Sequence, residues 1–474
     1  MTELHEYTAL ELHQLLQRRE VSPVELAEHY LERIERLDGA VGAFTTVTRD
    51  AALARARHVE QHVPTAAPLW GLPLADKDLH RRAGVPARFG SRAFTDFVPD
   101  DSDELVQSID AAGAVSLGKS ATPEFGLPSY TEGLVGPPTR NPWDPSLGAG
   151  GSSGGAAAAV ASGMLPFAPG SDGGGSIRIP AAACGLVGVK PSRGRVPAGS
   201  GLASLAGLGV AGPIARNVAD AALLLDGMIA PVGYPAAHRF AVRAPGDDGP
   251  YLGAAIRGEG RFQLGVLTDS PWDEAVEIEL APEARSALDR AIAVLEGLGH
   301  GIEAMEPVPE PGYPARFRTI WQAGAATIPV DGEAEALLEP LTRWLLERGR
   351  AVPARELAEA LAWLSGFEER VIRRFSPFDA VLTPALALTP RPVGWYDQHD
   401  GERNFAQQVA YTPFTSFVNV AGLPAITLPV EETEQGLPMG VQLIGRPGGE
   451  PTLFALAAQL ERRIRRGHRH PPNW

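Results

Sequence analysis

The sequence predicts an α/β protein in which helices and β-strands pack in layers. From Trp70 onward, short apolar runs of strand length alternate with longer segments of helical periodicity, which is typical of layered α/β folds. The chain has 474 residues, of which 44% are hydrophobic and 21% are charged, so it can bury a large core. The sequence contains no internal repeat of fixed period. One large sheet can therefore organise the whole chain.

The N-terminal segment predicts two helices on the surface of the main body. Thr8 can cap a helix over Ala9–Arg19. Ser22, followed by Pro23 at the first helical position, opens a second helix over Pro23–Leu37. The segments that follow are, in chain order, a helix at Leu105–Ala112, a strand at Ala114–Leu117, a small-residue helix at Ala156–Ser162, a strand at Gly265–Thr268 and an amphipathic helix at Pro282–Leu298.

The second half of the chain predicts a helical insertion followed by further strands. Val232–Arg261 is rich in Gly, Pro, Ala and Arg and has weak periodicity, so we expect a loop there. Ala315–Phe375 is mostly of helical pattern and could cover a central sheet. The closing elements are expected to be strands at Ala380–Leu382, Ala425–Val430 and Met439–Ile444 and a helix at Pro451–Arg463.

Charge and composition limit the partners of the chain. The net charge is −15 and the pI is near 5.3, so we expect no nucleic-acid partner, because duplex binding requires a concentrated basic face. We find neither a signal-peptide pattern nor an apolar run of bilayer length, and we expect a cytoplasmic protein without a membrane partner. The single cysteine, Cys184, lies among small residues and predicts a buried thiol rather than a disulfide or a multi-cysteine metal site. We expect no metal and no cofactor.

The use of lysine is unusual. The 42 basic residues include three lysines, Lys77, Lys119 and Lys190, and the others are arginines. A buried lysine can lose its proton and act as a base, whereas an arginine stays protonated in proteins. The three lysines therefore mark positions at which arginine could be unable to replace lysine.

Two glycine-rich segments, at 148–155 and 170–176, are separated by a compact small-residue helix. Glycine runs carry an entropic cost, so two such runs, each with serine, indicate a functional site more strongly than a pair of flexible loops. The second segment can form a nest of N–H donors for an oxyanion, which consists of Gly173, Gly174, Gly175 and Ser176. The Ser176 hydroxyl would lie beside these donors and would require a base. No histidine lies in either segment, and we interpret His80, the nearest one, as structural.

These segments resemble the amidase signature family. The motifs that carry the resemblance are Leu74–Leu79, Leu117–Gly126, Thr139–Asp144, Gly150–Gly155, Lys190–Arg195, Val420–Ala425 and Gly436–Gly445. They are spread over most of the chain, which makes the match more specific than any single short motif. Leu79, where many relatives have asparagine, and the segment Phe414–Ala425 are more similar to 6-aminohexanoate-cyclic-dimer hydrolases than to glutamine-using amidotransferase subunits.

The resemblance implies a Ser–cis-Ser–Lys triad. By position, Ser176 corresponds to the nucleophile, Ser152 to the middle serine and Lys77 to the base. The sequence alone does not distinguish Ser152 from Ser153, so this choice rests on the resemblance, as does a cis peptide bond before Ser152. The supporting residues are expected to be Ser153, Ser171, Asp172 and Arg178, of which Asp172 and Arg178 are expected to form an ion pair that shapes the nest.

The resemblance also implies a fold, a domain organisation and a substrate class. The fold is expected to be one domain, 1–474, with a central mixed sheet covered by helices on both faces. The expected parts are N-terminal helices at 1–60, a signature core at 61–230, a variable and mostly helical substrate-pocket region at 231–380 and a return to the core sheet at 381–474. The expected substrate is a small-molecule amide, with cyclic or oligomeric aliphatic amides as one group, and a homodimer is one assembly that fits.

Two alternatives stay open at this point. The chain could be the glutaminase subunit of a tRNA-dependent amidotransferase, or a non-catalytic amidase-like binding protein. Gly113–Ser120 matches the phosphate-loop pattern GxxxxGK[ST], but a helix is predicted before it and a strand within it, which is the reverse of the required order. We therefore expect a structural Lys119. Tyr130, Trp321 and Tyr411 are candidates for the pocket wall, although isolated aromatic residues more often belong to the core.

Overall fold

A mixed eight-stranded sheet forms the centre of the molecule in the computed structural model, which describes residues 2–196, 205–229, 251–467, 469–472 and 474. The strand order is β10-β9-β11-β13-β12-β7-β8-β6. Strand β9 pairs in parallel with β10 and β11, and all other neighbours are antiparallel. The strands are β6 (Phe167–Asp172), β7 (Val187–Lys190), β8 (Val210–Ala215), β9 (Gln263–Val266), β10 (Gly301–Ala304), β11 (Ala380–Pro384), β12 (Ala425–Glu432) and β13 (Pro438–Gly445).

A smaller three-stranded sheet lies beside β6. It has the order β1-β3-β2, in which β3 pairs antiparallel with β1 and parallel with β2. Its strands are β1 (Phe44–Val47), β2 (Pro73–Lys77) and β3 (Val115–Ser120), and a separate hairpin joins β4 (Arg140–Asn141) to β5 (Asp144–Gly148). Every residue of β2 and β3 is buried, and β2 packs against β6. This packing brings the end of β2 close to the end of β6.

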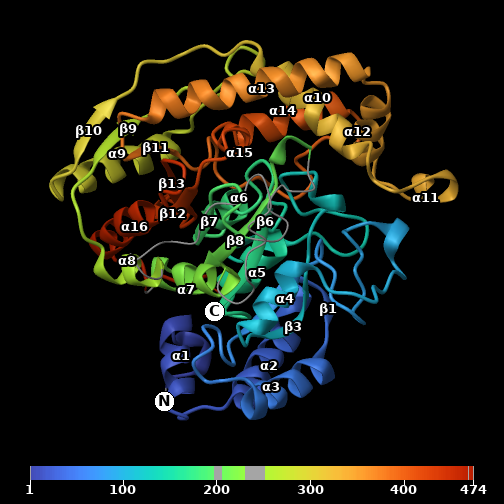
Figure 1. Cartoon of the computed structure of the whole chain (residues 1–474), viewed down its shortest axis with the longest axis vertical. Helices are drawn as coiled ribbons and strands as arrows, with labels where there is room; N and C mark the ends of the chain where they lie inside the picture. The colour runs from blue at the N-terminus through green and yellow to red at the C-terminus, as the bar shows by residue number, and fades with distance from the viewer. Residues whose placement is uncertain (1, 197–204, 230–250, 468, 473) are drawn as a thin grey trace.

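Helices surround the large sheet on both faces (Figure 1). Helices α7 and α16 pack on one face, and α6 and α15 lie on the opposite side, beneath the layer formed by α10, α13 and α14. The helices are α1 (Ala9–Gln17), α2 (Pro23–Val41), α3 (Arg49–His62), α4 (Glu104–Ala111), α5 (Gly154–Ala161), α6 (Arg178–Ala183), α7 (Val218–Ile229), α8 (Tyr251–Arg257), α9 (Pro282–Gly297), α10 (Tyr313–Ala325), α11 (Gly332–Ala336), α12 (Pro340–Arg350), α13 (Ala354–Phe375), α14 (Gly401–Tyr411), α15 (Ser416–Val420) and α16 (Glu450–Ile464). The predicted α/β class and sheet with helices on both faces are confirmed.

The local capping signals act as the sequence predicts. Thr8 accepts the Glu11 N–H at the start of α1, and Ser22 accepts the Glu25 N–H at the start of α2. Asp220 on α7 accepts the N–H groups of Ala9 and Leu10, at 2.9 Å each, and so fastens α1 to the body of the protein. The other predicted helices and strands are confirmed to within a few residues.

One element was predicted wrongly. Of the expected loop Val232–Arg261, residues 232–250 lie outside the described part of the chain, and Tyr251–Arg257 forms α8 rather than a loop. The N–H groups of Tyr251 and Leu252 donate to the Asp226 carboxylate of α7, at 2.8 and 2.9 Å. The Tyr251 ring packs against Phe454 of α16. Tertiary contacts that local periodicity does not reveal therefore hold this short helix.

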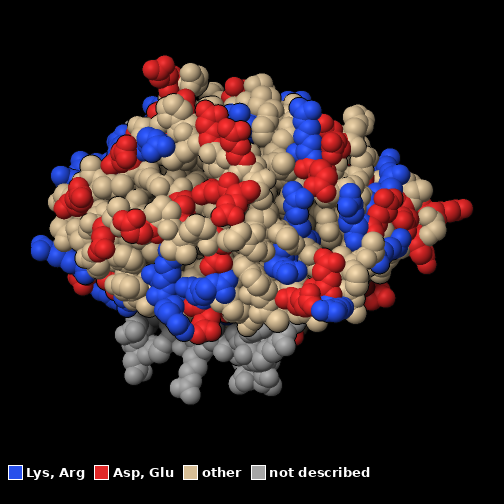
Figure 2. Space-filling view, turned by 90° about the horizontal axis from the view of Figure 1, so that it is seen from above, with Lys and Arg blue, Asp and Glu red and all other residues tan. Residues whose placement is uncertain are grey.

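The surface charges and the apolar character of the helices can be examined in the described part of the chain. On the face drawn in Figure 2, acidic and basic side chains are interspersed and do not form one continuous basic patch. Within the described ranges, no helix combines the length and the apolar character needed to cross a bilayer.

Candidate active site

The three triad candidates lie at the ends of elements that the packing of β2 against β6 brings together. Lys77 is the last residue of β2, Ser152 lies just before α5, and Ser176 lies between β6 and α6. Lys77 Nζ donates a 2.8 Å hydrogen bond to Ser152 Oγ. The Ser153 N–H donates to the Ser176 carbonyl at 3.1 Å and joins the two glycine-rich segments. The peptide bond between Gly151 and Ser152 is cis, as predicted.

The Lys77 ammonium is enclosed by neutral oxygen atoms. Besides Ser152 Oγ, it donates to Ser171 Oγ at 3.0 Å and to the Ser171 carbonyl at 3.3 Å. Its side chain is fully buried, and burial lowers the pKa of Lys77 to about 7, although the negative charge of Asp172 acts in the opposite direction. A substantial fraction of Lys77 is therefore neutral near pH 7, which is the state that a base requires.

The two aspartates beside Lys77 in sequence point away from it, as expected for alternating side chains on a strand. Asp76 accepts hydrogen bonds from Arg82 Nε at 2.6 Å and from Ser116 Oγ at 2.8 Å. Asp78 lies 3.6 Å from Lys119 Nζ, and Lys119 also donates to the His80 carbonyl. Lys119 is thus a structural cation within the small sheet. The segment Gly113–Ser120 follows α4 and contains β3, so it lacks the order of a phosphate loop.

Ser176 lies at the edge of a pocket. Its side chain is 7% exposed, whereas Ser152 is 1% exposed and Lys77 is not exposed. Among the described residues, no hydrogen bond joins Ser176 Oγ to Ser152 Oγ, so the predicted relay is only half formed. Hydrogen bonds of this kind often close only when substrate is bound.

Asp172 organises the turn around Ser176. Its carboxylate accepts the Gly175 N–H at 2.7 Å and the Ile177 N–H at 3.1 Å. The Gly175 N–H is therefore not available to an oxyanion, and Gly175 was wrongly predicted as a donor. Within the described ranges, the N–H groups of the other three predicted donors, Gly173, Gly174 and Ser176, donate to no other residue. Gly175 has φ +134°, and a Cβ there would lie 2.5 Å from Thr415 Oγ1.

A buried polar network holds Asp172 in place. Arg178 Nε and Nη2 donate to the two Asp172 oxygens at 3.0 Å each, and Asn419 Nδ2 donates to Asp172 Oδ1 at 2.9 Å. Arg178 Nη1 also donates to Gln442 Oε1 at 2.6 Å. Burial alone would raise the pKa of Asp172, but Arg178, Lys190 and Asn419 together hold this pKa well below its usual range. The expected ion pair is confirmed.

Several members of this network were not predicted. Asn419 lies more than 240 residues along the chain from its partner Asp172, and Gln442 lies more than 240 residues from its partner Arg178. A third unpredicted residue, Thr415, donates through Oγ1 to the Gly174 carbonyl at 2.6 Å. Asn419 directly precedes a family-like motif and Gln442 lies within another, which is the only signal that could have drawn attention to them.

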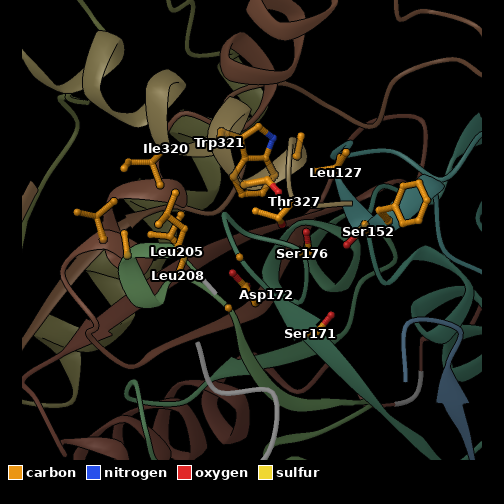
Figure 3. A pocket seen from close by; sticks show the side chains of 18 of the residues that line it. Leu127, Ser152, Ser171, Asp172, Ser176, Leu205, Leu208, Ile320, Trp321 and Thr327 are labelled. Carbon is orange, nitrogen blue, oxygen red and sulfur yellow. Dashed lines mark hydrogen bonds between the residues drawn. The ribbon is translucent and has the colours of Figure 1, made fainter. Parts of the chain in front are cut away.

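A pocket of about 1050 Å³ opens in front of Ser152 and Ser176. Figure 3 shows both serines below the Trp321 indole, with Leu205, Leu208 and Ile320 on one side. The charged pair Arg193–Glu368, joined at 3.0 Å, also borders this pocket. Trp321 is thus a lining residue, whereas Tyr130 and Tyr411 belong to a separate buried cluster.

The remaining sequence candidates have structural environments. His80 borders the pocket but contacts neither Ser152 nor Ser176 by hydrogen bond. Lys190 is fully buried and donates to the Pro191 carbonyl at 3.0 Å, and burial together with Arg178 lowers the pKa of Lys190 to about 7. Cys184 is buried, and burial raises the pKa of its thiol, so it is not a nucleophile.

The fold and this site place Ser176 beside backbone N–H groups that are unpaired in the described part of the chain and near a buried lysine, an arrangement suited to hydrolysis through a serine. Comparison with known proteins gives the family: the family model named Amidase matches residues 25–454, and the chain belongs to the amidase family, whose members hydrolyse amide C–N bonds.

The relatives and solved structures agree with this assignment. The chain is 38% identical over 452 residues to the "Putative amidase AmiB2" of Mycobacterium tuberculosis, covering 94% of each chain. It is 35% identical to one subunit of the glutamyl-tRNA(Gln) amidotransferase of Moorella thermoacetica, covering 99% of each. The fold matches a 6-aminohexanoate cyclic dimer hydrolase with a TM-score of 0.89, 28% identity and 99% coverage of each chain. It matches a bacterial aryl acylamidase with a TM-score of 0.85, 26% identity and coverage of 98% and 97%.

Proposed function

We propose that this chain hydrolyses carboxamides through an acyl-enzyme on Ser176, with Ser152 as the proton relay and Lys77 as the base. The observation that carries the proposal is the 2.8 Å hydrogen bond between the buried Lys77 Nζ and Ser152 Oγ, next to Ser176. The pKa of Lys77, near 7, supports its role as a base at neutral pH.

In the proposed reaction, neutral Lys77 accepts the proton of Ser152 Oγ, and Ser152 accepts the proton of Ser176 Oγ as this oxygen attacks the carbonyl carbon. The N–H groups of Gly173, Gly174 and Ser176 stabilise the oxyanion, and a donor of this kind typically contributes ~3 kcal/mol. The proton then returns through Ser152 to the leaving nitrogen, the C–N bond breaks, and water hydrolyses the acyl-enzyme by the reverse route.

Two experiments test these roles. A fluorophosphonate probe should label Ser176, and Ser176→Ala should abolish the labelling. A label on another residue would show that Ser176 is not the nucleophile. Lys77→Arg keeps a positive charge but removes a group that can be neutral, so turnover should fall by at least about 10²-fold. Turnover near that of the parent protein would exclude Lys77 as the base.

The similarity to the amidotransferase of Moorella thermoacetica keeps glutaminase activity as a second candidate. Arg193 and Glu368 pair with each other at the pocket, and apolar side chains form most of the remaining wall. This wall favours the first proposal, because the α-amino and α-carboxylate groups of glutamine are charged. Hydrolysis of glutamine that requires added partner proteins would support the second. A third possibility, a non-catalytic binding protein, would require that the chain hydrolyse no amide and resist serine-directed probes.

The organisation of the chain follows from the same proposal. We propose that 1–60 forms a surface layer, 61–230 and 381–474 form the core of the site, and 231–380 shapes the substrate pocket. Trp321 and Leu364, which line the pocket from α10 and α13, support this division. The expected cytoplasmic location and homodimer stay predictions, and sedimentation of the purified chain would test the latter.

A further inference from the structure

Two cavities of very different size meet at Ser176. The large pocket of about 1050 Å³ lies on the Ser152 side, and a second cavity of about 60 Å³ lies on the Gly174 side. Ser176, Leu127 and Trp321 border both cavities, so the Trp321 indole forms part of the wall between them. Figure 3 shows this indole above Ser176 and to its left.

Ser152 borders the large pocket but not the small cavity. When the C–N bond breaks, its electron pair stays on the nitrogen, which takes a proton from Ser152 Oγ, while the carbonyl carbon stays bonded to Ser176 Oγ. The leaving nitrogen must therefore lie on the Ser152 side. The oxyanion faces the N–H groups of Gly173, Gly174 and Ser176, and the acyl substituent of the same carbon points away from Ser152, toward the small cavity.

We propose that the small cavity binds the acyl group and the large pocket binds the amine, so that the substrates are amides of a short-chain acid with a bulky apolar amine. This inference rests on the proposed function of Ser176 and Ser152. The small cavity offers about 60 Å³ against about 1050 Å³ for the large pocket, so it suits the shorter of the two substituents. The large pocket can hold an aromatic or branched amine against Leu205, Leu208 and Ile320.

The walls of the small cavity are held in place by aromatic and polar contacts. Trp272 Nε1 donates to Ser416 Oγ at 3.0 Å, and the Tyr313 hydroxyl lies 2.8 Å from the same oxygen. The Trp272 ring makes edge contacts with Phe317 and Phe405, at centroid distances of 5.5 and 5.9 Å. Because closely packed walls of this kind cannot retreat without strain, the cavity should select acyl groups by length.

Hydrolysis of a matched amide series tests the inference. Acetanilide, butyranilide and hexananilide vary only the acyl group, and acetamide and hexanamide remove the bulky amine. We expect kcat/KM to fall by about tenfold or more from acetanilide to hexananilide, and acetanilide to exceed acetamide by at least about tenfold. The cyclic dimer of 6-aminohexanoate, which carries a long acyl chain, should be a poor substrate.

Two matched variants separate the cavities. Phe405→Ala, or Val409→Ala if the former does not fold, enlarges the small cavity and should raise the relative rate for hexananilide by about tenfold. Leu361→Ala enlarges the large pocket and should change the preference among amines while the preference among acyl groups stays that of the parent.

The outcomes separate this inference from the proposed function. Suppose that the fluorophosphonate probe labels Ser176. If hexananilide or hexanamide is then hydrolysed as fast as acetanilide, or if no member of the series is hydrolysed, the inference about the two cavities is wrong, while Ser176 remains the proposed nucleophile. If Ser176 is not labelled and no amide is hydrolysed, the proposed function fails and the inference fails with it.

Discussion

Replacement of Lys77 by methionine should abolish activity and yet stabilise the protein. Methionine has nearly the shape of lysine but neither charge nor proton, so Lys77→Met removes the base while it fills the same buried space. Turnover should fall by about 10²- to 10⁴-fold. In the parent protein, kcat/KM should decrease as the pH falls through about 7, because Lys77 is then protonated.

The expected gain in stability follows from the pKa of Lys77. In the unfolded chain this pKa is 10.5, and in the folded protein burial lowers it to about 7. Between these pH values the unfolded state holds a proton that the folded state has lost, so stability rises with pH across this window. Relative to an uncharged side chain, Lys77 therefore lowers the free energy of unfolding by about 4 kcal/mol at pH 7 and by about 2 kcal/mol at pH 9. Loss of the hydrogen bonds to Ser152 and Ser171 offsets about 1 kcal/mol each.

Urea unfolding at pH 7 and pH 9 measures the effect. The stability advantage of Lys77→Met over the parent should shrink by about 2 kcal/mol between the two values, because the lost hydrogen bonds contribute equally at both. Lys190→Met is the matched control: Lys190 is as deeply buried and has the same lowered pKa, but it contacts the Pro191 carbonyl instead of Ser152. It should show the same pH trend in stability with a much smaller loss of turnover. Equal loss of turnover in both variants, or a pH-independent difference for Lys77→Met, would refute the reasoning.

Three further substitutions probe the rest of the site. Ser152→Ala should lower kcat by about 10²- to 10⁴-fold with little change in the urea midpoint, which would distinguish a role of Ser152 in proton transfer from a purely structural role. Arg178→Gln leaves the buried Asp172 carboxylate without its cation and should lower the free energy of unfolding by about 3–5 kcal/mol, measured by urea titration; a loss below about 1 kcal/mol would show that the pair is dispensable. Gly175→Ala should lower stability by about 1–3 kcal/mol, seen in thermal melts, because its φ is +134° and its Cβ would collide with Thr415; a variant as stable as the parent would contradict this geometry.

Much of the fold and the candidate site residues could be identified from the sequence because their signals are local. Capping pairs such as Thr8 with Glu11, and apolar periodicity, define helices within a few neighbouring residues. The glycine runs around Ser152 and Ser176 are required by the local backbone, so they stand out in the sequence. Lys77 was marked by the scarcity of lysine in the chain.

The parts that the sequence did not predict depend on contacts between distant segments. Helix α8 is capped by Asp226 of another helix, and the Gly175 N–H is bound by a carboxylate whose orientation Arg178 and Asn419 determine. The small cavity likewise arises where α10, α14 and α15 meet, and the large pocket is lined by α10 and α13 together with the signature core, so no single segment carries that information.

The surroundings of Asp172 explain how the proposed base, Lys77, and the proposed oxyanion donors can lie close together. A carboxylate is needed to orient the N–H groups of Gly175 and Ile177, but its negative charge raises the pKa of Lys77 and so opposes the neutral base. Arg178 compensates that charge through two 3.0 Å hydrogen bonds, and burial then determines the pKa of Lys77. In the proposed mechanism, Arg178 is therefore a positioning residue without contact to Ser176: it allows the carboxylate to shape the turn while burial keeps Lys77 able to accept a proton.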